Sequence, residues 1–259
     1  MRQAADFLNE TFCVLSGDGV TDLDLSAALA FHREHEALAT MVLTRVPDPL
    51  EYGLVIPAAD GRVRAFVEKP GPGEAVSDTV NTGIYILEPE ILALIPEGRP
   101  CDFGGELFPR LVREGRAIYG CVLEGYWCDI GNCGAYLACV RDALAGRVNL
   151  ELPPAEHGIR ALSPIPLDAV ISTPVYIGQN VTIGEGARIG PYTVLGEGSK
   201  VGREARVIGS VVNGATIGQG ARLRDSILCR GAKVGDGAVL QEGCVIGEKA
   251  VIGEGALLH

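Results

Sequence analysis

The stretch VYIGQNVTIGEGARIGPYTVLGEGSKVG, residues 175–202, repeats an aliphatic residue followed by glycine every six positions. The aliphatic members of these pairs are Ile177, Ile183, Ile189, Leu195 and Val201. A six-residue period with one aliphatic residue per unit is typical of a left-handed parallel β-helix, in which three units form one triangular coil and the aliphatic side chains stack inside. This stretch therefore predicts the fold of the second half of the chain.

The repeat extends towards the end of the sequence. It slips between Val207 and Ile217, and then resumes with aliphatic residues at Val234, Leu240, Ile246 and Ile252. On this pattern, residues 171–259 resemble the hexapeptide-repeat proteins. The last repeat, VIGEGALLH, is still in phase and shows no polar cap, which predicts that this end is either incomplete or covered by a partner, and favours a homo-oligomer.

Two chemistries of hexapeptide-repeat proteins, acyl transfer and carbonic anhydrase activity, depend on histidine inside the solenoid. The single histidine in residues 171–259 is His259, the final residue. Acyl transfer needs a base and zinc-dependent hydration needs imidazole ligands, so both are disfavoured. We interpret the repeat as structural, either an oligomerisation surface or a regulatory appendage.

Residues 148–170 keep no steady period and contain Pro153, Pro154, Pro164 and Pro166, so we interpret them as a linker. Residues 1–147 alternate short apolar runs with helical patterns, which predicts an α/β sheet domain. The predicted strands cover 12–16, 39–46, 52–58, 63–69 and a run that starts at 117, and the predicted helices cover 25–38, 88–95, 105–114 and 134–147.

The chain carries 22 Lys and Arg against 33 Asp and Glu, a net charge of −11, which disfavours nucleic acid and anionic membranes as partners. No apolar run approaches the roughly 18 residues of a membrane span, and the N-terminus lacks the order of a secretory signal, so we expect a cytoplasmic protein.

The eight cysteines are scattered, which predicts reduced thiols. A zinc site at Cys128, Cys133 and Cys139 is disfavoured, because no histidine and no second close cysteine pair lies nearby.

Two isolated acids follow predicted strands. Asp18 in LSGDGV and Asp129 in GYWCDIGN each precede a glycine or a glycine turn, and open α/β sheets bind ligands at the carboxyl ends of their strands. Two carboxylates placed there could share one Mg²⁺ ion, which takes oxygen ligands and bridges phosphates. Read singly, each acid is equally compatible with an ordinary turn.

Two further motifs have both a functional and a structural interpretation. Glu68 and Lys69 in EKP offer a carboxylate for hydroxyl groups and an ammonium for a phosphate, or else form a surface salt bridge. NTGIYIL, residues 81–87, sets Asn-Thr-Gly against strand-forming residues, and Gly83 permits positive φ and close approach of a ligand. On local evidence we interpret residues 81–83 as a turn that joins two strands, with a ligand-facing segment as the alternative.

These pieces occur in one order: GDGVTD, PLEYG, EKP, NTGIY, GYWCDIG, a proline-containing linker and a hexapeptide solenoid. In that order the chain resembles the sugar-1-phosphate nucleotidyltransferases, and most of all the mannose-1-phosphate guanylyltransferase type and its glucose-1-phosphate relatives. The resemblance covers essentially the whole chain. It implies a truncated Rossmann-like nucleotidyltransferase domain over residues 1–147 and a left-handed parallel β-helix over residues 171–259.

The resemblance also implies the reaction. An oxygen of a sugar-1-phosphate attacks the α-phosphorus of a nucleoside triphosphate, which gives an NDP-sugar, of the GDP-mannose type, and pyrophosphate. The nucleoside triphosphate and the sugar-1-phosphate are therefore the expected partners. By the same resemblance, Asp18 and Asp129 hold Mg²⁺, Lys69 meets the sugar phosphate and Glu68 accepts a hydrogen bond from a sugar hydroxyl.

Gly53 of EYG and the segment Asn81, Thr82 and Gly83 match residues that line the sugar pocket, so the resemblance favours the ligand-facing interpretation of NTG.

Family members also begin with a Gly-rich loop, L-A-G-G-x-G-T-R-L followed by P-K-P, that holds the triphosphate, and this sequence has neither motif. We therefore expect impaired catalysis, an exposed apolar sheet edge and lowered stability. The alternative is a non-catalytic regulatory or scaffolding relative that binds sugar nucleotide and oligomerises. The base and the sugar stay open.

Overall fold

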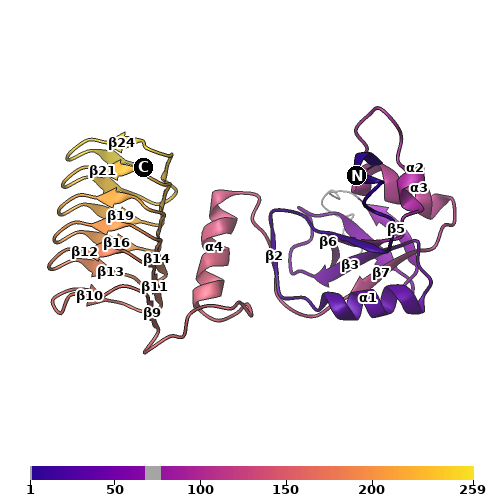
Figure 1. Cartoon of the computed structure of the whole chain (residues 1–259), viewed down its shortest axis with the longest axis horizontal. Coiled ribbons are helices and arrows are strands. Elements are labelled where there is room, and N and C mark those ends of the chain that lie inside the picture. The colour runs from indigo at the N-terminus through magenta and orange to yellow at the C-terminus, as the bar shows by residue number, and fades with distance from the viewer. Residues whose placement is uncertain (1, 68–76) are drawn as a thin grey trace. The chain divides into compact units, whose positions relative to one another are not determined.

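The computed structural model describes residues 2–67 and 77–259. The chain forms two compact units, Met1–Asp129 and Ile130–His259 (Figure 1). The first unit is a mixed α/β domain and the second is a parallel β-solenoid with one helix. Both of these folds were predicted from the sequence. In the described part of the chain, no helix is long and apolar enough to cross a bilayer.

The first unit is built on a six-stranded sheet in which β5, β4, β6, β3 and β7 are neighbours in that order and β1 also pairs with β6. Among the described strands of this sheet, the β3–β7 pair is parallel and the other pairs are antiparallel. A separate antiparallel pair joins β2 to β8. The strands are β1 (Phe12–Val14), β2 (Gly19–Thr21), β3 (Ala39–Arg45), β4 (Leu54–Pro57), β5 (Val63–Val67), β6 (Thr79–Leu87), β7 (Ile118–Val122) and β8 (Trp127–Asp129).

The sheet has an apolar core on each face, because alternate residues of its strands point to opposite sides. Ile84 and Ile86 of β6 pack in a cluster with Ala28 of α1 (Leu25–Glu34), whose N-terminus is capped by the Asp24 carboxylate. Tyr85 and Leu87 pack on the other side with residues of α2, a π-helical turn and α3. These last elements are α2 (Ile91–Leu94), the π-helical turn (Phe103–Leu107) and α3 (Phe108–Arg113), and a short 3₁₀ turn covers Arg2–Ala4.

Strand β1 lies at an open edge of the sheet. It pairs with β6 on one side, with Phe12 opposite Leu87 and Val14 opposite Tyr85, and no second partner strand exists among the described residues. The neighbouring Phe7 and Leu15 are 85% and 55% exposed. An apolar strand edge of this kind was predicted from the sequence, and the lowered stability that should accompany it stays a prediction.

The solenoid has three faces of parallel strands. The first face contains β10 (Val170–Ile171), β13 (Arg188–Ile189), β16 (Arg206–Ile208), β19 (Arg222–Arg224), β22 (Val239–Leu240) and β25 (Leu257–Leu258). The second face contains β9 (Ile159–Ala161), β11 (Val175–Ile177), β14 (Thr193–Leu195), β17 (Val211–Val212), β20 (Ile227–Leu228) and β23 (Val245–Ile246). The third face contains β12 (Thr182–Ile183), β15 (Lys200–Val201), β18 (Thr216–Ile217), β21 (Lys233–Val234) and β24 (Val251–Ile252).

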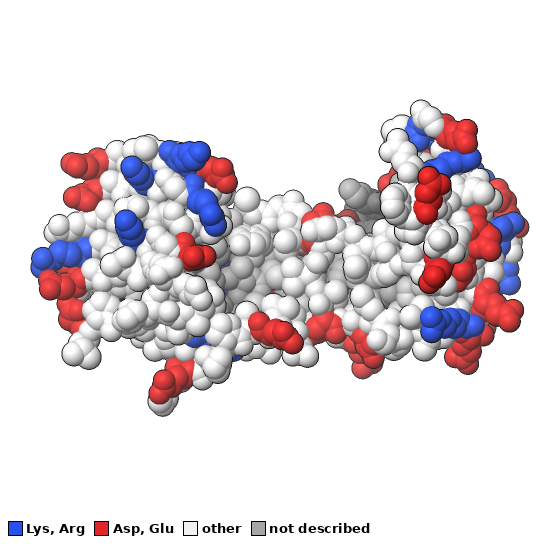
Figure 2. Space-filling view, in the orientation of Figure 1, with Lys and Arg blue, Asp and Glu red and all other residues white. Residues whose placement is uncertain are grey.

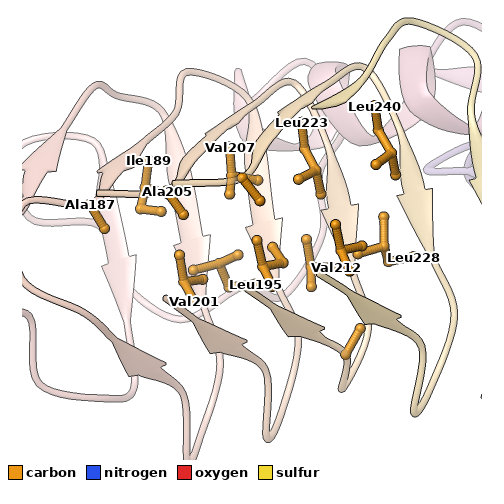
Figure 3. Packing of buried hydrophobic residues seen from close by; sticks show 14 of the residues in the cluster. Ala187, Ile189, Leu195, Val201, Ala205, Val207, Val212, Leu223, Leu228 and Leu240 are labelled. Atoms are coloured by element: carbon orange, nitrogen blue, oxygen red, sulfur yellow. The ribbon is translucent and has the colours of Figure 1, made fainter. Parts of the chain in front are cut away.

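The repeating aliphatic residues fill the solenoid, as Figure 3 shows for Ile189, Val207, Leu223 and Leu240. The slip in the repeat has a simple structural cause. Ile189 pairs with Val207, 18 residues later, whereas Val207 pairs with Leu223, only 16 residues later. Val212 follows Val207 by five positions and Ile217 follows Val212 by five, instead of six each, so one residue is lost at each of two corners of this coil. The stack of aliphatic side chains continues unbroken.

Helix α4 (Cys133–Leu144) belongs to the same compact unit as the solenoid. Arg141 of this helix forms an ion pair of 2.7 Å with Asp225, at the corner between β19 and β20. Strand β9 pairs in parallel with β11, so the second face already begins inside residues 148–170, the stretch interpreted from its prolines as a linker. The prolines interrupted the hexapeptide period there and concealed the first strand.

Candidate active site

One cavity of about 310 Å³ in the first unit gathers six of the residues singled out in the sequence. They come from four separate segments of the chain and are Asp18, Gly53, Asn81, Thr82, Gly83 and Asp129. Because short motifs far apart in the sequence converge on one cavity, this is the candidate functional site.

Asp18 and Asp129 are brought together by the pairing of β2 with β8. Gly19, which follows Asp18, lies directly opposite Asp129 in this antiparallel pair. The Ser16 hydroxyl donates a hydrogen bond of 2.5 Å to Asp18 Oδ1 and orients that carboxylate. Both carboxylates line the cavity.

These two carboxylates fit a Mg²⁺ ion better than a metal that needs a full set of protein ligands. Among the described residues, no group of three or more His, Cys, Asp or Glu side chains could hold a metal. Mg²⁺ is commonly bound by one or two carboxylates, with water and phosphate oxygens as its other ligands. None of the eight cysteines, all of which lie in the described residues, is paired in a disulfide.

The Asn81-Thr82-Gly83 segment is not a turn between two strands, so our local interpretation was wrong. It is a bulge inside the continuous strand β6. Leu43 of β3 pairs with Asn81 and the preceding Val42 pairs with Ile84, which leaves Thr82 and Gly83 as extra residues. Gly83 has a φ of +75°, and a glycine in this conformation is typical of a β-bulge beside a functional site.

Three side chains hold the bulge in place. Asn81 Oδ1 accepts the Gly83 N–H at 3.1 Å, and the Thr82 hydroxyl donates to the Val42 carbonyl at 2.7 Å. The indole N–H of Trp127 donates to the Thr82 carbonyl at 3.1 Å. The bulge is therefore fixed by hydrogen bonds before any ligand arrives, which lowers the entropic cost of binding.

Tyr52 and Trp127 form an aromatic wall that the sequence reasoning missed. Both line the cavity, and their rings meet edge to face with centroids 5.2 Å apart. Burial, followed by the charge of the Asp129 carboxylate, raises the pKa of the Tyr52 phenol. The sequence did contain a signal for both residues. Tyr52 directly precedes Gly53 in EYG, and Trp127 lies two residues before Asp129 in GYWCD.

The charge of the cavity is negative in the described part of the chain. Glu51 joins Asp18 and Asp129 in its lining, which there includes no Lys or Arg. A phosphate ligand therefore needs a cation at this site. The two residues predicted to meet the sugar phosphate and a sugar hydroxyl, Lys69 and Glu68, lie outside the described residues, so their positions stay predictions.

Comparison with known proteins agrees with this arrangement. Residues 1–146 match the sequence profile of the nucleotidyl transferases. Residues 164–258 match that of the EIF2B subunit epsilon LbH domain. The chain belongs to the nucleotidyl transferase family, as the order of its motifs predicted.

Three curated relatives illustrate the similarity. A UTP–glucose-1-phosphate uridylyltransferase of Synechocystis sp. is 37% identical over 231 residues, which cover 86% of this chain and 60% of that protein. Mannose-1-phosphate guanylyltransferase 1 of Arabidopsis thaliana is 34% identical over 70% of this chain and 46% of its own length. A mannose-1-phosphate guanylyltransferase of Mycobacterium tuberculosis is 33% identical over 71% and 50%. The chain thus spans about half the length of these relatives.

Proposed function

We propose that this chain takes part in nucleotidyl transfer from a nucleoside triphosphate to a sugar-1-phosphate. The observation that carries the proposal is the convergence of Asp18, Asp129, the β6 bulge and the Tyr52–Gly53 segment on one cavity of about 310 Å³. A cavity of this size accommodates a hexose-sized ligand. The negative lining requires a cation for the phosphate, which two carboxylates suited to Mg²⁺ can supply.

In the proposed reaction, an oxygen of the sugar phosphate forms a bond to the α-phosphorus. The bond from that phosphorus to the oxygen that bridges to the β-phosphate breaks, and pyrophosphate leaves with the electron pair. Asp18 and Asp129 would hold Mg²⁺, which neutralises the charge of the phosphates. Lys69 meets the sugar phosphate, and the protein otherwise contributes by aligning the two reactants.

The sugar lies, in this proposal, against the β6 bulge and the aromatic wall. Gly83 leaves the backbone bare, and the Asn81 amide donates to the Tyr85 hydroxyl at 2.8 Å, which fixes its orientation beside the cavity. Gly53 accepts the Asn81 N–H through its carbonyl at 2.9 Å and so ties two sugar-facing segments together. Glu68 accepts a hydrogen bond from a sugar hydroxyl.

We propose mannose-1-phosphate and GTP as the first pair of substrates, with GDP-mannose as the product. A specific observation supports a second pair, glucose-1-phosphate and UTP: the uridylyltransferase relative aligns over 86% of the chain, a larger share than the two guanylyltransferase relatives above. Epimeric sugars differ by the position of one hydroxyl, and a site that hydrogen-bonds this group discriminates strongly.

These 259 residues alone contain no Gly-rich triphosphate loop of the L-A-G-G type, so we expect slow turnover from them. The rival proposal is a non-catalytic relative that binds sugar nucleotide.

We also propose that the chain self-associates through its solenoid, where apolar side chains such as Leu257 are exposed.

The deciding experiment is pyrophosphate release with Mg²⁺, each nucleoside triphosphate, and mannose- or glucose-1-phosphate. The Asp129→Asn variant is the control. Turnover that this substitution abolishes supports transfer and identifies the substrates. Binding of NDP-sugar by isothermal titration calorimetry, without turnover for any pair, supports the non-catalytic rival.

A further inference from the structure

The three faces of the solenoid present different side chains to the outside. Outward residues of the second face, such as Val211 and Ile227, are apolar and are buried or half-buried, and α4 lies beside this face and forms a small cavity with it. The third face presents Thr182, Lys200, Thr216 and Lys233. The first face presents arginine, and nothing within the unit Ile130–His259 covers it.

Arg188, Arg206 and Arg222 lie in register on β13, β16 and β19 and form what we call the arginine ladder. Neighbouring strands are about 4.8 Å apart, so three guanidinium groups lie closely side by side. Arg224 adds a fourth, and it shares with Arg206 and Arg222 the lining of a shallow hollow of about 380 Å³. All four side chains are exposed, and none has an ion-pair partner among the described residues.

The ladder is flanked by exposed aliphatic side chains. Val170 and Leu257, in the same outward column, are 51% and 57% exposed, and Val239 lies between the ladder and Leu257. Protein interfaces are enriched in Arg and depleted in Lys, since the planar guanidinium binds carboxylates in a bidentate manner and is weakly hydrated. The first face has this composition, whereas the Lys and Thr of the third face are typical of a solvated surface.

Charge indicates what binds to the first face. Two copies of the ladder would repel each other, so this face does not pack on itself. The unit Ile130–His259 carries 12 Lys and Arg against 12 Asp and Glu, but the unit Met1–Asp129 carries 10 against 21, a net charge of −11. Figure 2 shows this contrast on one side of the molecule, with blue and red groups intermixed over the solenoid and a predominance of red over the first unit.

We infer that the arginine ladder binds the acidic Met1–Asp129 unit of a second copy of this chain. The contact is heterologous, with a basic solenoid face on one copy and an acidic surface on the other, and is strengthened by the flanking Val170 and Leu257. This inference deepens the self-association proposed above and does not rest on transferase activity. It assigns the contact to one face and to one chemistry, the pairing of guanidinium with carboxylate.

The test is sedimentation velocity of the full chain with two pairs of charge reversals. Arg206→Glu with Arg222→Glu alters the ladder, and Lys200→Glu with Lys233→Glu makes the same change of charge on the third face. We expect the wild type and the lysine variant to self-associate at about 0.05 M NaCl and to dissociate at about 0.5 M. The arginine variant should raise the dissociation constant at least about tenfold, and Arg206→Gln with Arg222→Gln should give an intermediate value.

Circular dichroism melting of each variant separates a loss of contact from a loss of folding. Carbodiimide labelling of carboxylates at low and high salt then tests the acidic side, and we expect salt-sensitive protection within Met1–Asp129. Self-association that survives in the arginine variant, or falls equally in both reversed variants, would overturn the ladder contact but leave self-association standing. A wild type that stays monomeric at low salt would overturn both, and would leave the ladder to an acidic partner other than this chain.

Discussion

The indole nitrogen of Trp127 donates a hydrogen bond to the carbonyl oxygen of Thr82 at 3.1 Å, and this bond links β8 to the bulge in β6. The first of these strands ends at Asp129, a proposed metal ligand, and the bulge is the proposed sugar contact. This side chain thus ties the proposed metal site to the proposed sugar contact.

Replacing Trp127 by Phe should therefore weaken sugar phosphate binding while the fold persists. Phe keeps an aromatic ring beside Tyr52 but loses the hydrogen bond, which is worth about 1 kcal/mol, or about fivefold in affinity. Isothermal titration calorimetry with mannose-1-phosphate and Mg²⁺ measures this. The Tyr119→Phe variant, altered in β7 outside the cavity lining, should bind as the wild type does, and equal affinities for all three proteins would contradict the role of Trp127.

Gly83 should tolerate no side chain. Its φ is +75°, and an added Cβ would lie 2.9 Å from the Ser16 Cβ, so Gly83→Ala combines backbone strain with a steric clash. We expect a loss of about 2 to 3 kcal/mol of unfolding free energy. Gly115 has a φ of +70° and open space around it. Gly115→Ala therefore measures the cost of the positive φ alone, which we expect to be about 1 kcal/mol of unfolding free energy.

Urea denaturation followed by fluorescence measures this difference in the first unit, because Trp127 is the single tryptophan of the chain. Equal losses in the two glycine variants would show that the contact with Ser16 adds no strain. A larger loss for Gly83→Ala would support a bulge held tightly against the loop that carries Asp18.

The bulge also shows where prediction from sequence stopped. Asn-Thr-Gly was identified as a backbone irregularity, and its contact with a ligand stays a prediction, but a single sequence does not show that Val42 and Leu43 of β3 pair around two extra residues. A turn and a bulge favour the same residue types. Only the pairing with a partner strand about 40 positions away distinguishes the two. Trp127 was missed for a similar reason, since its hydrogen bond to Thr82 joins distant segments.

The solenoid was more predictable because its contacts repeat. Each aliphatic residue packs on the equivalent residue of the next coil, so the period alone locates Ile189 and Leu195 in the core. The arginine ladder was not predicted, because its members recur only once per coil, 18 and then 16 residues apart, and not once per hexapeptide. Glu68 and Lys69 depend on the family resemblance alone.

The two proposed metal ligands can be distinguished from their neighbour Glu51, a third carboxylate in the same cavity. Asp18→Asn and Asp129→Asn each remove a charge without a large change in volume, and we expect each to lower Mg²⁺ affinity at least about tenfold and turnover about 100-fold. Glu51→Gln should leave both within about twofold. Titration of Mg²⁺ into each variant with a nucleoside triphosphate bound measures the Mg²⁺ affinity. A Glu51→Gln defect as large as the Asp defects would place the metal elsewhere in the cavity.

Glu88 should make the first unit less stable in acid. Burial raises the pKa of its carboxyl, but hydrogen bonds from Thr11 at 2.7 Å and His32 at 3.0 Å, with the charges of His32 and Arg33, outweigh this and lower the pKa from 4.5. A carboxyl whose pKa is lowered by folding stabilises the protein above its unfolded pKa, and this contribution is lost as pH falls through the folded pKa.

Urea denaturation between pH 7 and about pH 3 tests this linkage. The wild type should lose stability below its unfolded Glu88 pKa, and Glu88→Gln should lose less over the same interval. Thr11→Val, which removes one of the hydrogen bonds, should lie between the two. Glu90→Gln at an exposed neighbouring position is the matched control. If it reduced the loss of stability in acid as much as Glu88→Gln does, the effect would come from the removal of any negative charge and not from the Glu88 hydrogen bonds.

The stacked interior of the solenoid should be far more sensitive to substitution than its outer surface. Leu228 is fully buried and lies in register between Val212 and Ile246, so Leu228→Ala should cost about 2 to 5 kcal/mol. Thr216→Ala, on the exposed third face, should change stability by less than about 0.5 kcal/mol. Denaturation followed by circular dichroism gives both values. Because each coil contacts only its neighbours, hydrogen exchange should increase first in β17 and β23, and a uniform increase over the whole solenoid would contradict this local transmission.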